Sequence, residues 1–405
     1  MITIGVAGAL IFGGCGTPLS TLVLGKTGQA VVSATPAIGS TGADPDTPIV
    51  VQAANGTLTH VSVRGPKGEI AGTMDESGTT WTSSNKTLTF DSEYLIEASA
   101  VDPDGLMTTV NNGFRTLKPS NTFQAEVSGI SKGSKVGVGM PLRVTFTTPI
   151  QDRANVERKL KVYASKPLAG AWSWSEDRTQ VTFRPEKFWP ANTKIALRAP
   201  LYGVASSKKI FGSKNLSFDF STGSSLVLTV DASTLQLTVV RDGKKIRTIP
   251  VTTGKSGFAT RSGTVAIMGK EGTIRMTDPS LNGTSEAYDL DVSYSMRIRP
   301  SGEFIHAAPW SVGSQGYSRV SHGCIGMSTG NASWLYSMVE VGDPVIVKNT
   351  GREQELDNGI TDFSVPWRKW LKNSATGVQQ VGPGGGIAPA PAKAPAKAKT
   401  KGSAG

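Results

Sequence analysis

The chain has 405 residues, of which 38% are hydrophobic and 18% are charged, so it is long enough for about two to four globular domains and is not a multispanning membrane protein. Two cysteines and three histidines exclude a disulfide-stapled scaffold and a zinc site of four thiolates. The net charge is +11, but four lysines lie in residues 379–405, and the remaining charge forms no basic stripe with interleaved aromatic residues. We therefore expect no nucleic-acid binding, and a basic protein at an anionic cell surface accounts for the charge.

An uncharged apolar run, residues 2–14, precedes Cys15. At about 1.5 Å per residue it is too short for a hydrocarbon core of about 30 Å, and its length suits a secretory signal. Gly13-Gly14-Cys15 resembles the end of a bacterial lipoprotein signal, whose cysteine is acylated after cleavage, although Phe12 stands where Leu is preferred and no Lys or Arg precedes the run. A start codon assigned too far downstream would account for the missing basic residues. Another secretory signal and an uncleaved anchor are the alternatives, and all three place the chain outside the cytoplasm.

Short alternating apolar runs bounded by Gly, Asn, Asp or Pro fill the chain from residue 47 to residue 223. This spacing is typical of β-sandwiches. Trp81 precedes Phe90 by nine residues, and Trp174 precedes Phe183 by nine, which hints at an internal repeat. We expect two tandem immunoglobulin-like sandwiches, with His60 as a structural residue on a strand. The expected strands include residues 49–53, 58–64, 87–90 and 94–101 in the first sandwich, and residues 141–147, 159–164, 171–175, 180–183 and 194–199 in the second.

A third region begins at Ser224 with further alternating runs, joined by Asp242-Gly243, which predicts a hairpin turn. One helix is expected over Asn331–Val341 with Asn331 as its N-cap, because apolar residues recur there at helical spacing. Aromatic residues within 351–378 predict a small subdomain packed on the preceding β domain. The Gly/Pro/Ala/Lys composition that follows is typical of disorder.

Cysteine and histidine concentrate in one stretch of this third region, at His306, His322 and Cys324. A nucleophilic cysteine needs a nearby base or cation, because a free thiol has a pKa of about 8.5 and is mostly protonated at neutral pH. Gly323 allows the backbone to approach a substrate closely, so the amides of Gly323 and Cys324 are candidates to bind a developing oxyanion. A zinc site built from the same three side chains is a weaker alternative, because no further histidine or cysteine is available.

Residues 226–350 resemble the catalytic domain of the L,D-transpeptidases (YkuD type), through the block Ser321-His322-Gly323-Cys324 and His306, which lies 16 positions before His322. The preceding immunoglobulin-like modules and the Pro-Trp-containing C-terminal subdomain resemble actinobacterial peptidoglycan-crosslinking members. The resemblance implies that Cys324 is the nucleophile and that His306 is the base that makes it a thiolate. His322 would help to hold and polarise the site.

The resemblance also implies substrate contacts at Tyr288 in the donor pocket, at Trp310 at its mouth, and along the backbone near Ser301, Gly302, Ser321 and Gly323. The chain departs from the family pattern twice. Gly326 stands where Asn or Arg is frequent, and Ala307 stands where some relatives have Ser. A backbone carbonyl would still orient the imidazole of His306.

The implied activity is 3→3 crosslinking of peptidoglycan through a cysteine thioester, with release of D-Ala from a tetrapeptide donor and without a metal or organic cofactor. An L,D-carboxypeptidase or a protein-to-peptidoglycan linking enzyme would use the same thioester, and a non-catalytic wall-binding protein is the alternative from another class. The expected partners are donor and acceptor stems and, through a lipid anchor, the cell membrane. We expect a monomer at the membrane facing the wall, or in the wall.

The fold expectation is mainly β: two tandem immunoglobulin-like β-sandwiches, a β-rich catalytic domain with one short helix, and a small C-terminal subdomain. The expected boundaries are a signal at 1–15, a flexible tether at 16–46, sandwiches at 47–118 and 119–223, the catalytic domain at 224–350, the subdomain at 351–378 and a disordered tail at 379–405.

Overall fold

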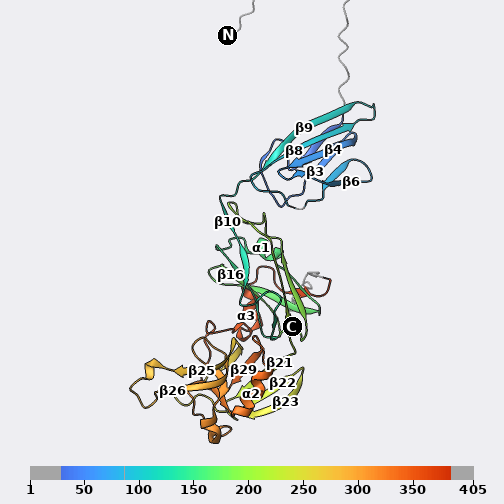
Figure 1. Ribbon diagram of the computed structural model, residues 1–405. Coiled ribbons are helices and arrows are strands. Elements are labelled where there is room, and N and C mark those ends of the chain that lie inside the picture. The colour runs from blue at the N-terminus through green and yellow to red at the C-terminus, as the bar shows by residue number, and fades with distance from the viewer. Residues whose placement is uncertain (1–28, 86, 385–405) are drawn as a thin grey trace, which may run out of the picture. The chain divides into compact units, whose positions relative to one another are not determined.

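The computed structural model describes residues 29–85 and 87–384, and the chain forms two compact units, Met1–Leu117 and Lys118–Gly405 (Figure 1). The signal expected up to Cys15 and the tail beyond residue 384 lie outside the described residues. Within the described ranges, no helix is long and apolar enough to cross a membrane. The architecture is mainly β with few helices, as the sequence predicts.

The first unit is a sandwich of two β-sheets around one hydrophobic core. In its long strand β8, every second residue from Tyr94 to Ala100 is buried, which is the alternation expected of a strand with one face on a core. One sheet has the order β1 (Val31–Thr35), β3 (Val50–Ala54), β7 (Thr80–Ser83), β6 (Gly72–Met74). The other has the order β2 (Thr41–Ala43), β9 (Met107–Thr116), β8 (Glu93–Val101), β4 (Thr57–Gly65), β5 (Gly68–Glu69).

Two expectations about this unit are wrong. The flexible tether expected at 16–46 contains strands β1 and β2, because Val32 and Ala34 pack on the core and β1 pairs with β3 along its whole length. The strand expected at 87–90 does not form: Leu88 is buried, but its N–H donates to the carbonyl of Pro45, outside any ladder. Phe90 therefore lies outside any strand whereas Phe183 lies in β16, so the nine-residue spacing does not mark equivalent positions in the two sandwiches.

The second unit begins with another sandwich, whose core is rich in large aromatic residues, including Trp172, Phe183 and Trp189. A short helix, α1 (Arg153–Lys159), follows the N-cap Asp152. The first of its sheets has the order β11 (Ala125–Ser128), β13 (Leu142–Phe146), β16 (Gln180–Pro185), β15 (Leu168–Trp174), β30 (Gln379–Val381). The other sheets have the orders β12 (Lys135–Val136), β20 (Leu216–Thr222), β17 (Lys194–Ala199), β14 (Lys161–Ala164) and β10 (Asn121–Phe123), β19 (Ile210–Gly212), β18 (Ala205–Ser207).

Two further sheets share a second core and carry the cysteine–histidine stretch. The predicted turn at Asp242-Gly243 is confirmed, since both residues have positive φ, as a tight hairpin between β22 and β23 requires. The larger sheet has the order β23 (Lys244–Pro250), β22 (Gln236–Arg241), β21 (Leu226–Asp231), β29 (Pro344–Lys348), β24 (Gly263–Ala266). The smaller has the order β25 (Gly269–Thr277), β26 (Asp289–Arg297), β27 (Phe304–Ala307), β28 (Ile325–Met327), with short 3-10 helices η1 (Pro279–Leu281) and η2 (Pro309–Ser314) in its connections.

The expected helix forms, but its start is two residues earlier than predicted. Helix α2 spans Thr329–Met338, and its N-cap is Ser328, whose hydroxyl accepts from the N–H of Asn331. A serine hydroxyl three positions before that amide can satisfy it, so Asn331 becomes part of the first turn.

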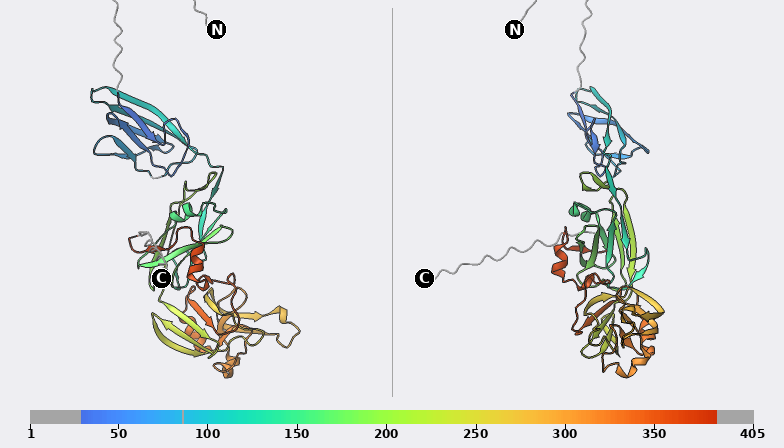
Figure 2. Two further views of the ribbon diagram at one scale, coloured as in Figure 1. Left: turned by 180° about the vertical axis from the view of Figure 1, so that it is seen from behind. Right: turned by 90° about the vertical axis from the view of Figure 1, so that its left-hand side faces the viewer.

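The C-terminal segment packs on the second sandwich, where Figures 1 and 2 show α3 (Trp367–Lys372) beside the sheets. The indole N–H of Trp370 donates to the carbonyl of Ala171 at 3.0 Å, and the Arg184 guanidinium lies 4.7 Å from the Trp370 ring centre. A 3-10 helix, η3 (Asp362–Ser364), precedes α3. The expectation of one helix is therefore too low, and the tail expected to begin at residue 379 instead begins with β30, which pairs with β15.

A buried carboxylate fixes the segment that leads into β30. Glu157 of α1 has no exposed surface and accepts hydrogen bonds from the indole of Trp174 at 2.6 Å and from the backbone and hydroxyl groups of Ser374, Ala375 and Thr376 at 2.6–3.0 Å. We expect Glu157→Ala to lower the free energy of unfolding of the second unit by about 2–4 kcal/mol, because several buried donors lose their acceptor. Denaturant unfolding measures this loss.

The matched control is Glu176→Ala, at an exposed glutamate in the turn between β15 and β16. It should change the free energy of unfolding by less than about 0.5 kcal/mol. Equal effects of the two substitutions would contradict the assigned role of Glu157.

Candidate active site

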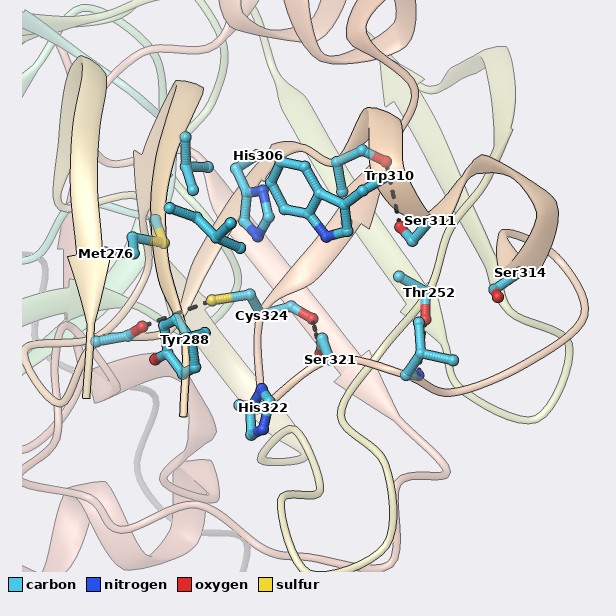
Figure 3. Close-up of a pocket in the computed structure, with 16 residues that line it drawn as sticks. Thr252, Met276, Tyr288, His306, Trp310, Ser311, Ser314, Ser321, His322 and Cys324 are labelled. Atoms are coloured by element: carbon cyan, nitrogen blue, oxygen red, sulfur yellow. Dashed lines mark hydrogen bonds between the residues drawn. The ribbon is translucent and has the colours of Figure 1, made fainter. Parts of the chain in front are cut away.

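The cysteine and both histidines of the sequence motif line one cavity of about 400 Å³ (Figure 3). Its walls come from the β25–β26 hairpin, from β27, from η2 and from the loop that leads into β28. Apolar side chains, among them Met276, Leu290 and Val292, line one side of the cavity. Such a mixed lining is typical of sites that bind a substrate and hold a few polar groups in fixed positions.

Parallel pairing of β27 with β28 places His306 and Cys324 together. Ile305 lies opposite Ile325, and His306 lies opposite Gly326. The isoleucines face the core, so His306, on the other face of its strand, points into the cavity together with the residues that flank Ile325. Cys324 is the first of these, which brings its side chain beside the imidazole although the two residues are 18 positions apart.

The His306 imidazole is buried and oriented by the backbone. Its Nδ1 lies 2.7 Å from the carbonyl oxygen of Ala307, and because a carbonyl only accepts, Nδ1 carries the proton. The lone pair is then on Nε2. The Trp310 ring stacks on the imidazole with the ring centres 6.0 Å apart. Ala307 thus orients the base through its main chain, as expected for a chain that lacks serine at this position.

Desolvation favours the uncharged forms of both His306, which is buried, and Cys324, which is half-buried. Desolvation lowers the pKa of His306 below its usual value. Desolvation also raises the pKa of the Cys324 thiol to about 12, and the nearby Glu303 carboxylate adds to this rise. The sequence argument expects a thiolate held by His306, whereas both of these pKa shifts favour the uncharged forms, a thiol and a neutral imidazole. Sγ lies 3.6 Å from the carbonyl oxygen of Gly302, to which the thiol donates.

The loop before β28 is held by its own serine and by a glycine with positive φ. The Ser321 hydroxyl donates to the carbonyl of Cys324 at 2.6 Å and accepts from the Gly323 N–H at 3.2 Å. Gly323 has a φ of +125°, which side-chain-bearing residues rarely adopt, and its carbonyl accepts from the Thr260 hydroxyl at 2.8 Å. The Gly323 amide, expected to face an oxyanion, is therefore already engaged within the loop.

Crowding accounts for Gly326, at the position where the resemblance leads us to expect Asn or Arg. A Cβ at this position would lie 2.9 Å from the Cβ of Ala308 and 3.1 Å from Cγ2 of Thr252. The backbones of Gly326 and Thr252 also hydrogen-bond to each other in both directions, at 2.9 and 3.0 Å. A side chain at residue 326 would force these segments apart.

The other residues expected to contact substrate differ in position. Tyr288, Gly302 and Trp310 line the cavity, and Trp310 is 54% exposed, which suits an aromatic side chain at the mouth. Ser301 does not line it, and its hydroxyl instead accepts from the side-chain amide of Asn358 at 3.0 Å. Gly323 does not line the cavity, and its positive φ instead sets the path of the loop backbone.

His322 is held on several sides by residues that the sequence argument missed. Its Nε2 lies 2.8 Å from Oε2 of Glu286, a carboxylate that also binds Nζ of Lys255. The Phe258 ring packs edge-to-face with the imidazole at 4.6 Å between ring centres, and Tyr288 stacks on it at 5.0 Å. Glu286 lies in an irregular connection 36 positions before His322, and no motif marks it.

A buried network of ion pairs supports the loop that carries Cys324. Glu303 accepts from Arg299 at 2.7 Å and from Arg261 at 2.8 Å, and Arg299 is completely buried. Arg299 also donates to the side-chain carbonyl of Gln354 at 2.8 Å, so the segment after β29 contributes to the network. Within residues 29–85 and 87–384, no three His, Cys, Asp or Glu side chains come together as a metal site.

The neutral pair has a measurable consequence for thiol chemistry. Because the pKa of Cys324 is raised, its alkylation by iodoacetamide should keep accelerating above pH 9 rather than level off near about 8.5, as for a free thiol. His306→Ala should leave alkylation at high pH within about threefold. It should slow acylation by a peptide substrate about 10²–10⁴-fold, because only that reaction needs a general base.

Intact mass spectrometry against pH, in a Cys15→Ala background, follows both reactions. A wild-type alkylation rate that is already at its plateau at pH 7 would mean a preformed thiolate and would contradict the neutral pair.

Known proteins are similar to this chain in both its Ig region and its catalytic domain. Residues 225–347 match the family described as the L,D-transpeptidase catalytic domain, and residues 40–205 match a bacterial Ig domain. L,D-transpeptidase 2 of Mycobacterium tuberculosis is 33% identical over 89% of this chain and 87% of its own length, and L,D-transpeptidase 5 of the same species is 33% identical over 84% and 76%. A solved structure of an L,D-transpeptidase in complex with imipenem is 36% identical, with a TM-score of 0.47, and covers 55% of this chain and 97% of that one. The chain therefore belongs to the L,D-transpeptidase family, with a bacterial Ig region followed by a catalytic domain of the YkuD type.

Proposed function

We propose that this L,D-transpeptidase, an enzyme of peptidoglycan, forms 3→3 crosslinks through a thioester on Cys324. The observation that carries the proposal is the position of Cys324 beside His306 in one cavity, with the Nδ1 proton of the imidazole bound to the carbonyl of Ala307. This arrangement leaves a basic nitrogen available for the thiol proton. An orienting acceptor, a base and a nucleophile are the parts that such acyl transfer requires.

Acylation follows from the neutral pair. Nε2 of His306 takes the thiol proton as Sγ bonds to the carbonyl carbon of the third stem residue, a diamino acid. The negative charge on the carbonyl oxygen is stabilised by the backbone amide of Cys324, because the Gly323 amide already donates to Ser321. His306 then returns the proton to the nitrogen of D-Ala, the C–N bond breaks, and the thioester remains.

The walls of the cavity suit a peptide stem. The Tyr288 ring and the apolar side chains of the β25–β26 hairpin provide contact surface for the donor, and Trp310 covers the mouth beside His306. Aromatic side chains give large contact area at low entropic cost. An amine from a second stem then attacks the thioester.

Products distinguish crosslinking from hydrolysis. Purified protein incubated with a disaccharide-tetrapeptide should yield a crosslinked dimer that has lost one D-Ala, as identified by mass. Release of the tripeptide alone would indicate an L,D-carboxypeptidase and would contradict the crosslinking proposal.

Covalent chemistry at Cys324 gives a second test. A carbapenem presents a strained acyl group, so imipenem should form an adduct of one molecule per chain that survives intact mass measurement. Cys324→Ala should abolish it, whereas Ser321→Ala, which loses only the loop contacts of the hydroxyl, should slow adduct formation without preventing it. An adduct on the Cys324→Ala variant would remove the cysteine from its assigned role.

We further propose that the enzyme, which acts on the cell wall outside the cytoplasm, is anchored by a lipid on Cys15. The apolar run before this cysteine supports the proposal. Wild-type protein should then partition into detergent with membranes, and Cys15→Ala should appear in the medium or stay unprocessed. Membrane association that is unchanged in Cys15→Ala would instead favour an uncleaved anchor. The activity of the catalytic domain should be the same in the wild type and in Cys15→Ala.

A further inference from the structure

The connection between β25 and β26 carries a carboxylate that contacts the catalytic loop. Glu286 accepts from Nε2–H of His322 at 2.8 Å and from the ammonium of Lys255. Phe258 and Tyr288 confine the imidazole from other directions. An imidazole held by a carboxylate on one nitrogen is the arrangement in which the other nitrogen serves as a base.

The contact with Glu286 fixes which nitrogen of His322 is free. Lys255 first, and then His322, lower the pKa of Glu286, so the carboxylate is ionised and only accepts hydrogen bonds. Nε2 therefore carries a proton, and in the neutral imidazole Nδ1 carries the lone pair. Among residues 29–85 and 87–384, no group donates a hydrogen bond to Nδ1.

The two histidines lie on different sides of the nucleophile. Figure 3 shows His306 on one side of Cys324 and His322 on the opposite side, and all three residues line the same cavity. A thioester on Cys324 is therefore flanked by two imidazoles. His306 is next to Trp310, whereas His322 is next to Tyr288 and the hairpin connection.

The surroundings of the two rings suit different proton transfers. His306 is buried, and only a backbone carbonyl contacts its Nδ1. Among the described residues, no carboxylate stabilises its protonated form there, so it suits a step in which it holds the thiol proton only until the leaving amine takes it. His322 is contacted by Glu286, and it lies near the Asp278 carboxylate, whose pKa is lowered by Ser280 first and also by His322. The charged and titratable groups facing it are Glu286, Asp278 and Tyr288 from the connection, Lys255 from the loop after β23, and Cys324 from its own loop.

We propose that Glu286 is a positioning residue that holds His322 as the base for the acceptor amine, so that His306 serves acylation and His322 serves transfer. The inference deepens the proposed crosslinking activity and rests on it. The acceptor is a primary amine, which enters as an ammonium because such amines have a pKa of about 10.4. The carboxylates of Glu286 and Asp278 attract this cation.

The proton balance of the transfer step is complete. Nδ1 of His322 takes one proton from the acceptor ammonium, and the amine bonds to the thioester carbon. The C–S bond breaks, and a second proton passes from the attacking nitrogen through Nε2 of His306 to Sγ. The product is an amide that keeps one N–H, Cys324 is again a thiol, and the proton on His322 is released to water.

The test separates the two half-reactions in the full chain with Glu286→Gln. Acylation is followed as the rate of imipenem adduct formation, which needs no acceptor amine. Transfer is followed as the rate of crosslinked dimer from a disaccharide-tetrapeptide, between pH 6 and 10. Asp289→Asn is the matched control, because Asp289 is a neighbouring carboxylate at the start of β26 that pairs with Arg275 and does not line the cavity.

We expect Glu286→Gln to change imipenem acylation by no more than about threefold and to slow dimer formation about 10–100-fold at pH 7. The deficit should shrink toward pH 10, where the acceptor amine loses its proton without help. Asp289→Asn should match wild type in both assays.

Equal losses of acylation and transfer in Glu286→Gln, or a transfer deficit that does not depend on pH, would overturn the assignment. A similar transfer deficit in Asp289→Asn would also overturn it, because the effect would then come from the general charge of the hairpin. Wild-type enzyme that releases tripeptide and no dimer would refute the proposed function itself. If instead the wild type crosslinks and the Glu286→Gln variant crosslinks equally well, only the role assigned to Glu286 is refuted.

Discussion

The parallel pairing of β27 with β28 is the constraint on which the site depends. The register sets His306 opposite Gly326, so the base and the nucleophile share one face although η2 and a long loop separate them in sequence. The same register needs a residue without a side chain at position 326, because Ala308 and Thr252 already occupy that space. The residue that departs from the family pattern is thus required by the packing of the strand that carries the nucleophile's loop.

Burial and charge divide the work between the two imidazoles. On the His306 side, desolvation favours the uncharged form of both members of the pair. On the His322 side, an ammonium, a carboxylate and an imidazole lie in contact at a partly exposed edge. Desolvation therefore disfavours charged groups on one side of Cys324, whereas charged side chains lie in contact on the other, although both histidines come from the same short stretch of sequence.

The sequence predicts most of the fold class because sandwich strands alternate strongly, as in β8, and because Asp-Gly sets a hairpin turn. The sequence-based prediction misses β1. Its small residues are typical of a linker, and it becomes a strand by pairing with β3. In the site, the cysteine and the histidines can be identified from the sequence because these residue types are rare in this chain. Glu286 and Glu303 cannot be identified in this way, because a glutamate in a connection is not distinguishable in sequence from a surface glutamate. Only the fold brings them into contact with His322 and Arg299.

Strand β30 changes how the modules of the second unit are related. The chain leaves the second sandwich after β20, builds both sheets of the catalytic domain, and returns to place β30 beside β15. In topological terms the catalytic domain is an insertion within the sandwich and does not simply follow it. A fragment that ends after β29 would keep Cys324 and both histidines of the site, but it would expose the backbone edge of β15, the kind of open edge at which β proteins pair with other chains.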